Sequence, residues 1–124
     1  MAQLNPSDIR FAEVHDDFTP FEIVGTEDLG FFRRGEGWKA LENGTTQLGG
    51  SFPVNPSGGL KSRGHPVGAS GLAQMVEIIL QLRGEAGQER QLEKAEVGLA
   101  QSIGGLGNNN IVTILERCDR KKVL

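Results

Sequence analysis

A segment rich in glycine and proline, NPSGGLKSRGHPVGASG, spans residues 55–71 and leads directly into an apolar stretch that ends at Leu82. Proline restricts the backbone beside it, and glycine permits turns that are closed to other residues, so the segment predicts an ordered loop. Apolar side chains then recur at helical spacing, and Gly84 is a suitable helix stop. Backbone N–H groups at a helix N-terminus lack partners and favour negative charge. The loop delivers His65 to that point, so His65 is the leading functional candidate.

The composition sets the broad class of protein. A chain of 124 residues with 37% hydrophobic residues can build one core, and we assign residues 1–124 to a single domain. The formal net charge of -3 argues against general nucleic-acid binding. No apolar run is long enough to span a membrane, and the N-terminus does not resemble a signal peptide, so we expect a cytoplasmic protein. The single cysteine, Cys118, allows no internal disulfide and no cysteine metal cluster.

The first predicted strand ends in a polar turn. Residues 9–14 (IRFAEV) form a short apolar run that is typical of a buried strand. His15 and Asp17 follow at once, so both lie at the carboxyl end of a strand, where open α/β sheets place their ligands. These two residues therefore join His65 as candidates.

A helix is expected after this turn. Thr19 and Glu22 have capping-box spacing, Pro20 suits the first helical position, and Gly30 would end the helix. Three apolar side chains are expected to face the core: Phe21, Val24 and Leu29.

Residues 31–50 carry charges and scattered glycines without a sustained period, which indicates an irregular surface segment. Arg33, Arg34 and Lys39 lie near Trp38 in the sequence and could meet an anionic ligand such as a nucleotide. A solvated loop against which Trp38 packs is the favoured interpretation.

The helix predicted after Gly71 is apolar around most of its circumference, which indicates burial between two layers. Gln74 and Gln81 are expected at its edges. Residues 84–96 are charged and predict an exposed connection or a short helix.

Two further strands are predicted at residues 97–103 and 111–115, joined by a loop rich in glycine and asparagine. A short strand is expected at residues 52–55, and the basic tail at residues 117–122 is expected to be a solvated end. The resulting order, β-α-β-α-β-β, predicts an α/β layered domain with a buried helix.

The loop at residues 55–71 resembles the GGLxxxGHPxGxSG block of the thiolase superfamily, in its sterol-carrier-protein-type branch. Two other segments resemble active-site loops of the C-terminal half of that fold. Residues 15–18 (HDDF) are similar to a family loop that reads NEAF or HDCF, and residues 102–104 (SIG) are similar to a CxG loop. The resemblance covers residues 8–117 and implies the C-terminal half of the five-layered thiolase fold.

The resemblance implies roles for several residues. His65 would donate a hydrogen bond to a thioester oxygen and help to activate a nucleophile, and His15 would hold a water in the first oxyanion hole. The backbone N–H of Gly104 would contribute to a second oxyanion hole. Three neighbouring residues would take part in substrate binding: Gly64, Pro66 and Ser102. The structural alternatives are a loop histidine that satisfies local hydrogen bonds, a histidine in a polar turn, and an ordinary hairpin glycine.

Two departures from the family pattern affect the expected activity. Asp17 and Ser102 stand where many family members have a cysteine. The nucleophilic cysteine of the family belongs to its N-terminal half, so we expect this chain to be inactive in thiolysis or Claisen condensation by itself. Three interpretations stay open: a half that completes a site with a partner, a non-catalytic module that binds an acyl-CoA or a protein, and part of an aldolase-like lyase in which Asp17 is a base.

The same resemblance implies an acyl-CoA substrate, with coenzyme A as its carrier and no tightly bound cofactor. The expected partners are a thiolase N-terminal half or a second copy of the chain, and a small OB-fold zinc-ribbon protein is a further candidate. A mixed metal site is disfavoured because only one tight histidine–aspartate cluster exists and no HExxH helix is present. Its members would be Glu13, His15, Asp16, Asp17 and His65.

Overall fold

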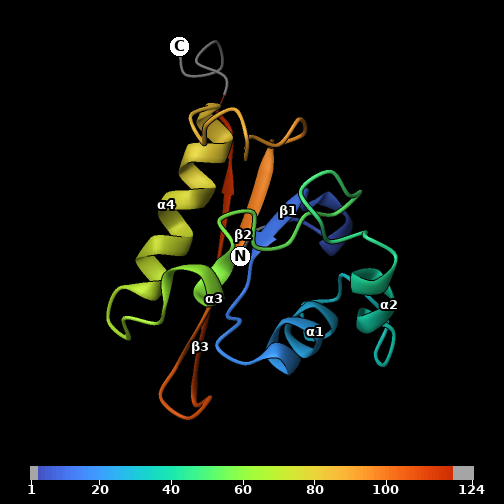
Figure 1. Cartoon of the computed structure of the whole chain (residues 1–124), viewed down its shortest axis with the longest axis vertical. Helices are drawn as coiled ribbons and strands as arrows, with labels where there is room; N and C mark the ends of the chain where they lie inside the picture. Colours follow the sequence, from blue (N-terminus) through green and yellow to red (C-terminus); the bar gives the residue numbers. More distant parts are fainter. Residues whose placement is uncertain (1–2, 119–124) are drawn as a thin grey trace.

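The computed structural model describes residues 3–118, which form a mixed α/β domain (Figure 1). In chain order the elements are a 3-10 turn η1 (Pro6–Asp8), β1 (Phe11–Glu13), α1 (Thr19–Asp28), α2 (Gly37–Glu42), α3 (Gly59–Arg63), α4 (Ser70–Arg83), β2 (Val97–Gly104) and β3 (Asn109–Glu116). None of the helices in this described part of the chain is long and apolar enough to cross a bilayer.

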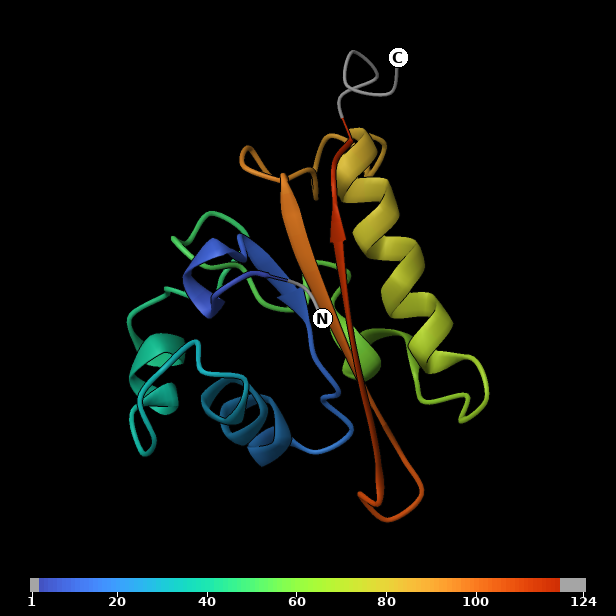
Figure 2. The same cartoon turned by 180° about the vertical axis from the view of Figure 1, so that it is seen from behind.

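The three strands form one sheet in the order β1-β2-β3. β1 is parallel to β2, and β2 pairs antiparallel with β3 along a long hairpin. α4 runs along one side of the sheet, and α1 and α2 lie on the other side (Figures 1 and 2). The predicted layers and the two C-terminal strands are thus confirmed, with β3 beginning and ending slightly outside the predicted range.

Both faces of the sheet carry a core, because successive side chains of a strand point to opposite faces. The α4 side holds one buried cluster: Phe11, Ile78, Leu82, Leu92, Ala95 and Ala100. The opposite side holds the other: Ile9, Ala12, Val14, Val54, Val97 and Leu99. Gly98 is required under α4, because a Cβ there would lie 2.6 Å from Phe11 Cζ and 2.9 Å from Ile78 Cγ2.

The strand predicted at residues 52–55 is wrong, since this segment makes only an isolated parallel bridge between Val54 and Ala12. Pro53 has no N–H to donate, and Asn55 has a positive φ of 52° that turns the chain away from the sheet. The Asn55 side chain instead accepts the Val14 N–H at 2.8 Å, which takes the place of a further ladder bond.

Helix α1 begins and ends where predicted, but its orientation differs from the prediction. The helix lacks a side-chain cap, and the residues buried on it are Gly25 and Thr26. Phe21 and Val24 are exposed, whereas Leu29 packs on the core as predicted. Small residues face inward because the Gln101 side chain lies against Gly25, where a Cβ would be 3.0 Å from Gln101 Oε1.

Residues 31–50 are not wholly irregular, because they contain α2. The Glu27 carboxylate fixes its start by accepting the N–H groups of Gly35 at 2.9 Å and Gly37 at 2.8 Å. These hydrogen bonds hold the pKa of Glu27 below its usual range. Trp38 is half exposed and donates to the Gly35 carbonyl at 3.1 Å.

Two of the three cations named for this segment, Arg34 and Lys39, have acidic neighbours. Arg34 pairs with Asp28 at 3.3 Å, and Lys39 pairs with Glu36 at 3.1 Å. These pairs leave the anion-binding alternative without support from the geometry.

Helix α4 is covered on one face only, although burial between two layers was predicted. Gln74 and Gln81, expected at the edges, are 0% and 1% exposed, and both face the interior. Three large apolar residues point away from the sheet and are 69%, 54% and 40% exposed: Leu72, Val76 and Ile79. The buried amides are tolerated because Gln74 Nε2 donates to the Gln101 carbonyl at 2.9 Å and Gln81 Nε2 donates to the Arg90 carbonyl at 2.9 Å.

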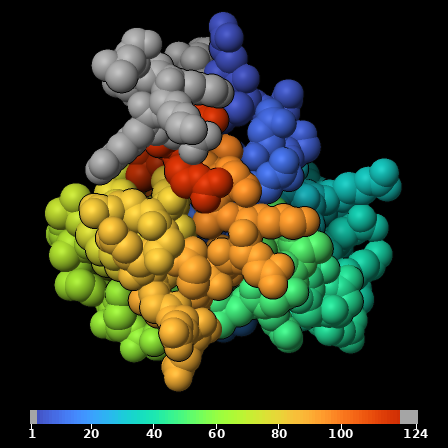
Figure 3. All heavy atoms as spheres, turned by 90° about the horizontal axis from the view of Figure 1, so that it is seen from above, coloured from blue at the N-terminus to red at the C-terminus, as the bar shows by residue number. Residues whose placement is uncertain are grey.

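The connection at residues 84–96 forms no helix and is less exposed than predicted, since Ala86, Leu92 and Ala95 are buried. Figure 3 shows this segment, in gold and orange, beside α4 at one end of the molecule. The Leu92 N–H donates to Gln81 Oε1 at 2.9 Å, so the buried amide of α4 holds the connection in place. Most of the predicted basic tail, from residue 119 on, lies outside the described residues.

Candidate active site

One cavity of about 350 Å³ lies where three loops meet. The loops are the turn after β1, the loop that enters α4, and the end of the β2–β3 hairpin. The residues that line the cavity are His15, Asp17, Phe18, Phe21, His65, Val67, Ile103, Gly104, Gly105, Leu106 and Gly107. The four residues predicted as catalytic from the sequence are therefore neighbours in space.

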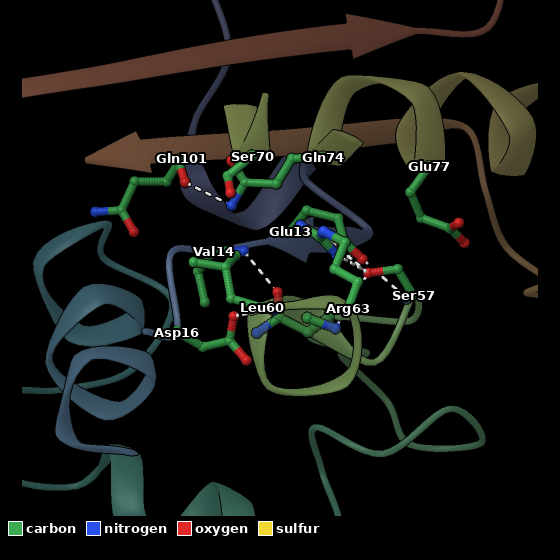
Figure 4. Close-up of polar contacts among 12 residues, drawn as sticks. Glu13, Val14, Asp16, Ser57, Leu60, Arg63, Ser70, Gln74, Glu77 and Gln101 are labelled. Atoms are coloured by element: carbon green, nitrogen blue, oxygen red, sulfur yellow. Dashed lines mark hydrogen bonds and ion pairs between the residues drawn. The ribbon is translucent and has the colours of Figure 1, made fainter. Parts of the chain in front are cut away.

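The GGL part of the loop motif is explained by a buried carboxylate. Asp16 is 2% exposed, and its Oδ1 accepts the Leu60 N–H at 2.7 Å. Gly59 has a φ of 67°, and a Cβ on it would overlap the Asp16 carboxylate. Only glycine allows this approach, which joins the turn after β1 to the start of α3 (Figure 4).

The C-terminal end of α3 is anchored by a second buried acid, Glu13, which is 0% exposed. Its carboxylate accepts the Ser57 N–H at 2.9 Å and the Ser57 hydroxyl at 2.8 Å, and it lies 3.7 Å from Arg63 Nη1 (Figure 4). Burial raises the pKa of Glu13 to about 7, although the Ser57 hydrogen bonds and Arg63 oppose that shift. Arg63 immediately precedes Gly64 and His65, so this anchor sets the start of the histidine loop.

His65 lies at the rim of the cavity with one ring nitrogen engaged. Its Nδ1 is 2.8 Å from the hydroxyl of Ser70, which is buried at the first turn of α4. Nε2 is the ring nitrogen that this contact leaves available. Gly64 and Pro66 flank His65 in the chain but are not among the residues that line the cavity.

His15 lies edge-on to His65, with ring centroids 4.9 Å apart and an interplanar angle of 86°. The side chain is 3% exposed, and its Nε2 is 3.8 Å from Asp17 Oδ2. Burial lowers the pKa of His15, and Asp17 partly offsets that effect. Nδ1 of His15 is buried without a hydrogen-bond partner among the described residues. His15 is therefore a neutral imidazole at neutral pH with hydrogen-bonding capacity left over.

The hairpin contributes backbone to the cavity. Gly104 ends β2 and lines the cavity. Ser102 is two residues earlier and does not line it. Its hydroxyl lies against Gly71 of α4, where a Cβ would be 2.8 Å from Ser102 Oγ. Ser102 thus meets the start of α4.

Apolar residues at the cavity were missed in the sequence. Phe21 was expected in the core but lines the cavity with Phe18, and their ring centroids are 6.0 Å apart. Val67 and Leu106 are also exposed there. Helical periodicity identified an apolar position at Phe21 but could not say which surface it faces.

The five residues of the disfavoured metal alternative do not form a set of metal ligands. Within residues 3–118, no group of three or more His, Cys, Asp or Glu side chains is placed to hold a metal ion. The carboxylates of Glu13 and Asp16 are taken up by the backbone and side chains of the α3 region.

Residues 1–117 match the family model described as thiolase C-terminal domain-like. The chain belongs to this family. It is 55% identical over 117 residues to an acetyl-CoA acetyltransferase of Methanothermobacter thermautotrophicus, covering 94% of this chain and 30% of that protein. It is 49% identical over 111 residues to sterol carrier protein 2 of Bos taurus, covering 90% of this chain and 20% of that protein. The family predicted from the loop motifs is thus confirmed.

A solved structure agrees with the fold. The structure titled Ltp2-ChsH2(DUF35) aldolase matches with a TM-score of 0.75 and 28% sequence identity, over 94% of this chain and 29% of that chain. The predicted α/β fold of the thiolase C-terminal half is confirmed by this match. The chain spans less than a third of the length of these relatives.

Proposed function

We propose that this chain is the C-terminal half of a thiolase-type acyl-CoA acyltransferase, which makes or breaks a carbon–carbon bond next to a thioester carbonyl. The observation that carries the proposal is the meeting of His15, His65 and Gly104 around one cavity on the loops that match the family. Such chemistry needs hydrogen-bond donors aimed at a developing oxyanion or enolate.

The two histidines suit complementary tasks. His65 lines the cavity, and its Nε2, which the Ser70 contact leaves available, would donate to the thioester oxygen. His15, which burial keeps neutral, would hold a water beside it. The N–H of Gly104 would serve a second oxyanion site across the cavity. Gly64 and Pro66 would set the position of the His65 ring, and Ser102 would support the adjoining helix.

The remaining half of the site would come from an N-terminal half that carries the nucleophilic cysteine. Support comes from the exposed apolar face of α4 and from the exposed Ile111 and Val112 of β3. Exposed apolar surface of this kind marks an interaction site. The matched acetyl-CoA acetyltransferase is more than three times as long as the matched segment, which leaves room for such a half. By itself the chain would then be inactive.

We also propose acyl-CoA as the substrate, with no tightly bound cofactor, and a cytoplasmic location. The solved aldolase names two components in its title, which supports a second subunit such as a small OB-fold zinc-ribbon protein. Self-association through the same apolar face is the competing arrangement.

A second candidate is an aldolase-like lyase, favoured by Asp17. Its Oδ2 lies 3.8 Å from His15 Nε2 at the cavity, and Asp17 stands where the family loop that reads HDCF has a cysteine. In a retro-aldol step, Asp17 would accept the hydroxyl proton of a β-hydroxyacyl-CoA. The bond between the α- and β-carbons would break, releasing a carbonyl compound and an acyl-CoA enolate that is then protonated. No acyl-enzyme is needed in that step.

A chimera tests both candidates. Residues 1–117 would replace the corresponding segment of the Methanothermobacter acetyl-CoA acetyltransferase, to which they are 55% identical. We expect thiolysis of acetoacetyl-CoA, and a loss of about 10²- to 10⁴-fold in kcat for His65→Ala. Arg83→Ala, on the exposed end of α4, is the matched control.

Each result of this experiment has a distinct meaning. Cleavage of a β-hydroxyacyl-CoA that is lost in Asp17→Asn, without thiolysis, would select the lyase. A folded chimera that binds acetyl-CoA in calorimetry but catalyses neither reaction would leave a non-catalytic binding module. Thiolysis that is unchanged in His65→Ala would remove His65 from the mechanism.

A further inference from the structure

Behind His65 lies a buried hydroxyl that the family resemblance gave no role. Ser70 is the first residue of α4 and is 1% exposed. Its Oγ lies 2.8 Å from His65 Nδ1 and 3.2 Å from the carbonyl oxygen of Pro66. The hydroxyl has a single proton and therefore donates to one of these two acceptors at a time.

The Pro66 carbonyl is already satisfied by the backbone. It accepts the Ala69 N–H at 2.8 Å and the Ser70 N–H at 2.9 Å. A carbonyl oxygen has two lone pairs, and both are engaged by these bonds. The imidazole Nδ1 is the nearer acceptor and has no other hydrogen-bond partner among the described residues. The Ser70 hydroxyl therefore donates its hydrogen bond to His65 Nδ1.

We propose that Ser70 is a positioning residue that holds neutral His65 in the tautomer with its proton on Nε2. In a neutral imidazole one nitrogen is a donor and the other an acceptor, and the partner of one nitrogen sets the state of the other. With Nδ1 accepting from Ser70, Nε2 is a donor toward the cavity. This deepens the proposed function, because the ring would then meet an oxyanion as a donor before it acts as a base.

The serine is well placed for this task because its own position is fixed. Its N–H is bonded to the Pro66 carbonyl at the first turn of α4, and the side chain is enclosed. The next residue, Gly71, admits the Ser102 hydroxyl, so the start of the helix packs closely on β2. Ser70 can therefore hold the ring without a change in the loop.

Nitrogen NMR of the imidazoles tests the proposal directly. The chain has two histidines, so a His15→Gln variant assigns the signals. At a pH where both rings are neutral, we expect the proton of His65 on Nε2 in the wild type. Ser70→Ala should give a mixture with at least a several-fold larger share of the Nδ1–H form, and Ser70→Thr should restore the wild-type state. Ser51→Ala, at an exposed serine that does not line the cavity, should change nothing.

The proposal is overturned by an Nδ1–H form in the wild type, or by a Ser70→Ala variant with the wild-type tautomer. Should Ser70→Ala fail to fold, the wild-type spectrum and Ser70→Thr decide the matter. No substrate is present in these measurements. An inactive chimera would therefore refute the proposed function and would not affect the inference about Ser70. An Nδ1–H tautomer of His65 in the wild type would refute only the inference about Ser70.

Discussion

An ordinary surface helix buries its apolar residues and exposes its polar ones, but on α4 several polar residues are buried and several apolar ones are exposed. The face toward the sheet buries Gln74, Glu77 and Gln81, together with Ile78 and Leu82. The face away from the sheet exposes three large apolar residues: Leu72, Val76 and Ile79. The inner face is held by hydrogen bonds and ion pairs, whereas the outer apolar face has no cover within residues 3–118.

This difference supports the proposal that the outer face of the helix meets a partner. On its inner face, several buried polar groups find specific partners, such as Arg90 Nη1 at 2.6 Å from Glu77 Oε2, whereas Gln74 Oε1 has no hydrogen-bond partner among the described residues. Directional partners of this kind fix the orientation of the helix. The outer face is apolar, and burial of apolar surface is favourable without directional contacts, so this face suits a partner that also has an apolar surface.

The largest expected effect on stability is the difference between alanine substitutions at two adjacent isoleucines. Ile78 is 0% exposed, and Ile78→Ala should lower the free energy of unfolding by about 2–5 kcal/mol. Ile79→Ala on the outer face should cost at most about 1 kcal/mol, because its surroundings are already solvated. Urea unfolding of the isolated chain measures both. Equal losses would show that the outer face is covered.

A somewhat smaller effect is expected from the ion pair of the inner face. Arg90→Ala leaves the carboxylate of Glu77, which is 4% exposed, without its cation. Removing one partner of a buried pair costs about 3 kcal/mol. The control is Arg83→Ala, whose exposed pair with Glu85 should be worth about 0.5 kcal/mol or less. A negligible effect of Arg90→Ala would mean that hydrogen bonds from Gln81 suffice for Glu77.

A pH effect of similar or smaller size is expected from Glu13, which lies near the inner face. Its pKa is about 7 in the folded protein and 4.5 ordinarily, so its contribution to stability is full below pH 4.5 and is lost as the pH rises through 7. The loss is on the order of 3 kcal/mol at most. Unfolding at a series of pH values should show this fall in the wild type and a flatter profile in Glu13→Gln. The same slope in both proteins would contradict the assignment.

The smallest effect on the isolated chain is expected from the outer face. Val76→Ser should change its unfolding free energy by about 1 kcal/mol or less, because Val76 is half exposed. The same change should weaken association with a thiolase N-terminal half by about 1–2 kcal/mol. Titration calorimetry against that half measures the association. Sedimentation of the chain alone shows whether Val76→Ser instead disrupts a self-assembly.

The features that the sequence predicted best depend on local backbone chemistry. The loop around His65 is built by glycines and prolines whose conformations are restricted wherever they occur, and Gly84 ends α4 as expected. The turn after β1 follows from an apolar run that stops at His15. These signals were sufficient to place His15, His65 and Gly104 in loops of one family.

The errors share a physical cause. Phe21 and Gln74 each lie on a helix whose limits were predicted well, yet Phe21, expected in the core, is exposed and Gln74, expected at an edge, is buried. A hydrophobic period identifies the faces of a helix but not which neighbour meets each face. The sequence did not reveal that Glu13 anchors α3 or that Ser70 contacts His65. These partners are brought together only in the folded chain, and residue type alone does not predict them.

The sequence by itself thus determined most of the elements, since dihedral restrictions and apolar periods act over a few neighbouring residues, and its loop motifs indicated the family and the candidate residues. Only the tertiary structure decided that His15 meets His65 edge-on, that Asp16 and Glu13 anchor α3, and that α4 turns its apolar stripe outward. Those outcomes depend on hydrogen bonds and packing between segments more than forty residues apart, such as Leu60 with Asp16. Contacts of that range form only when the whole domain folds.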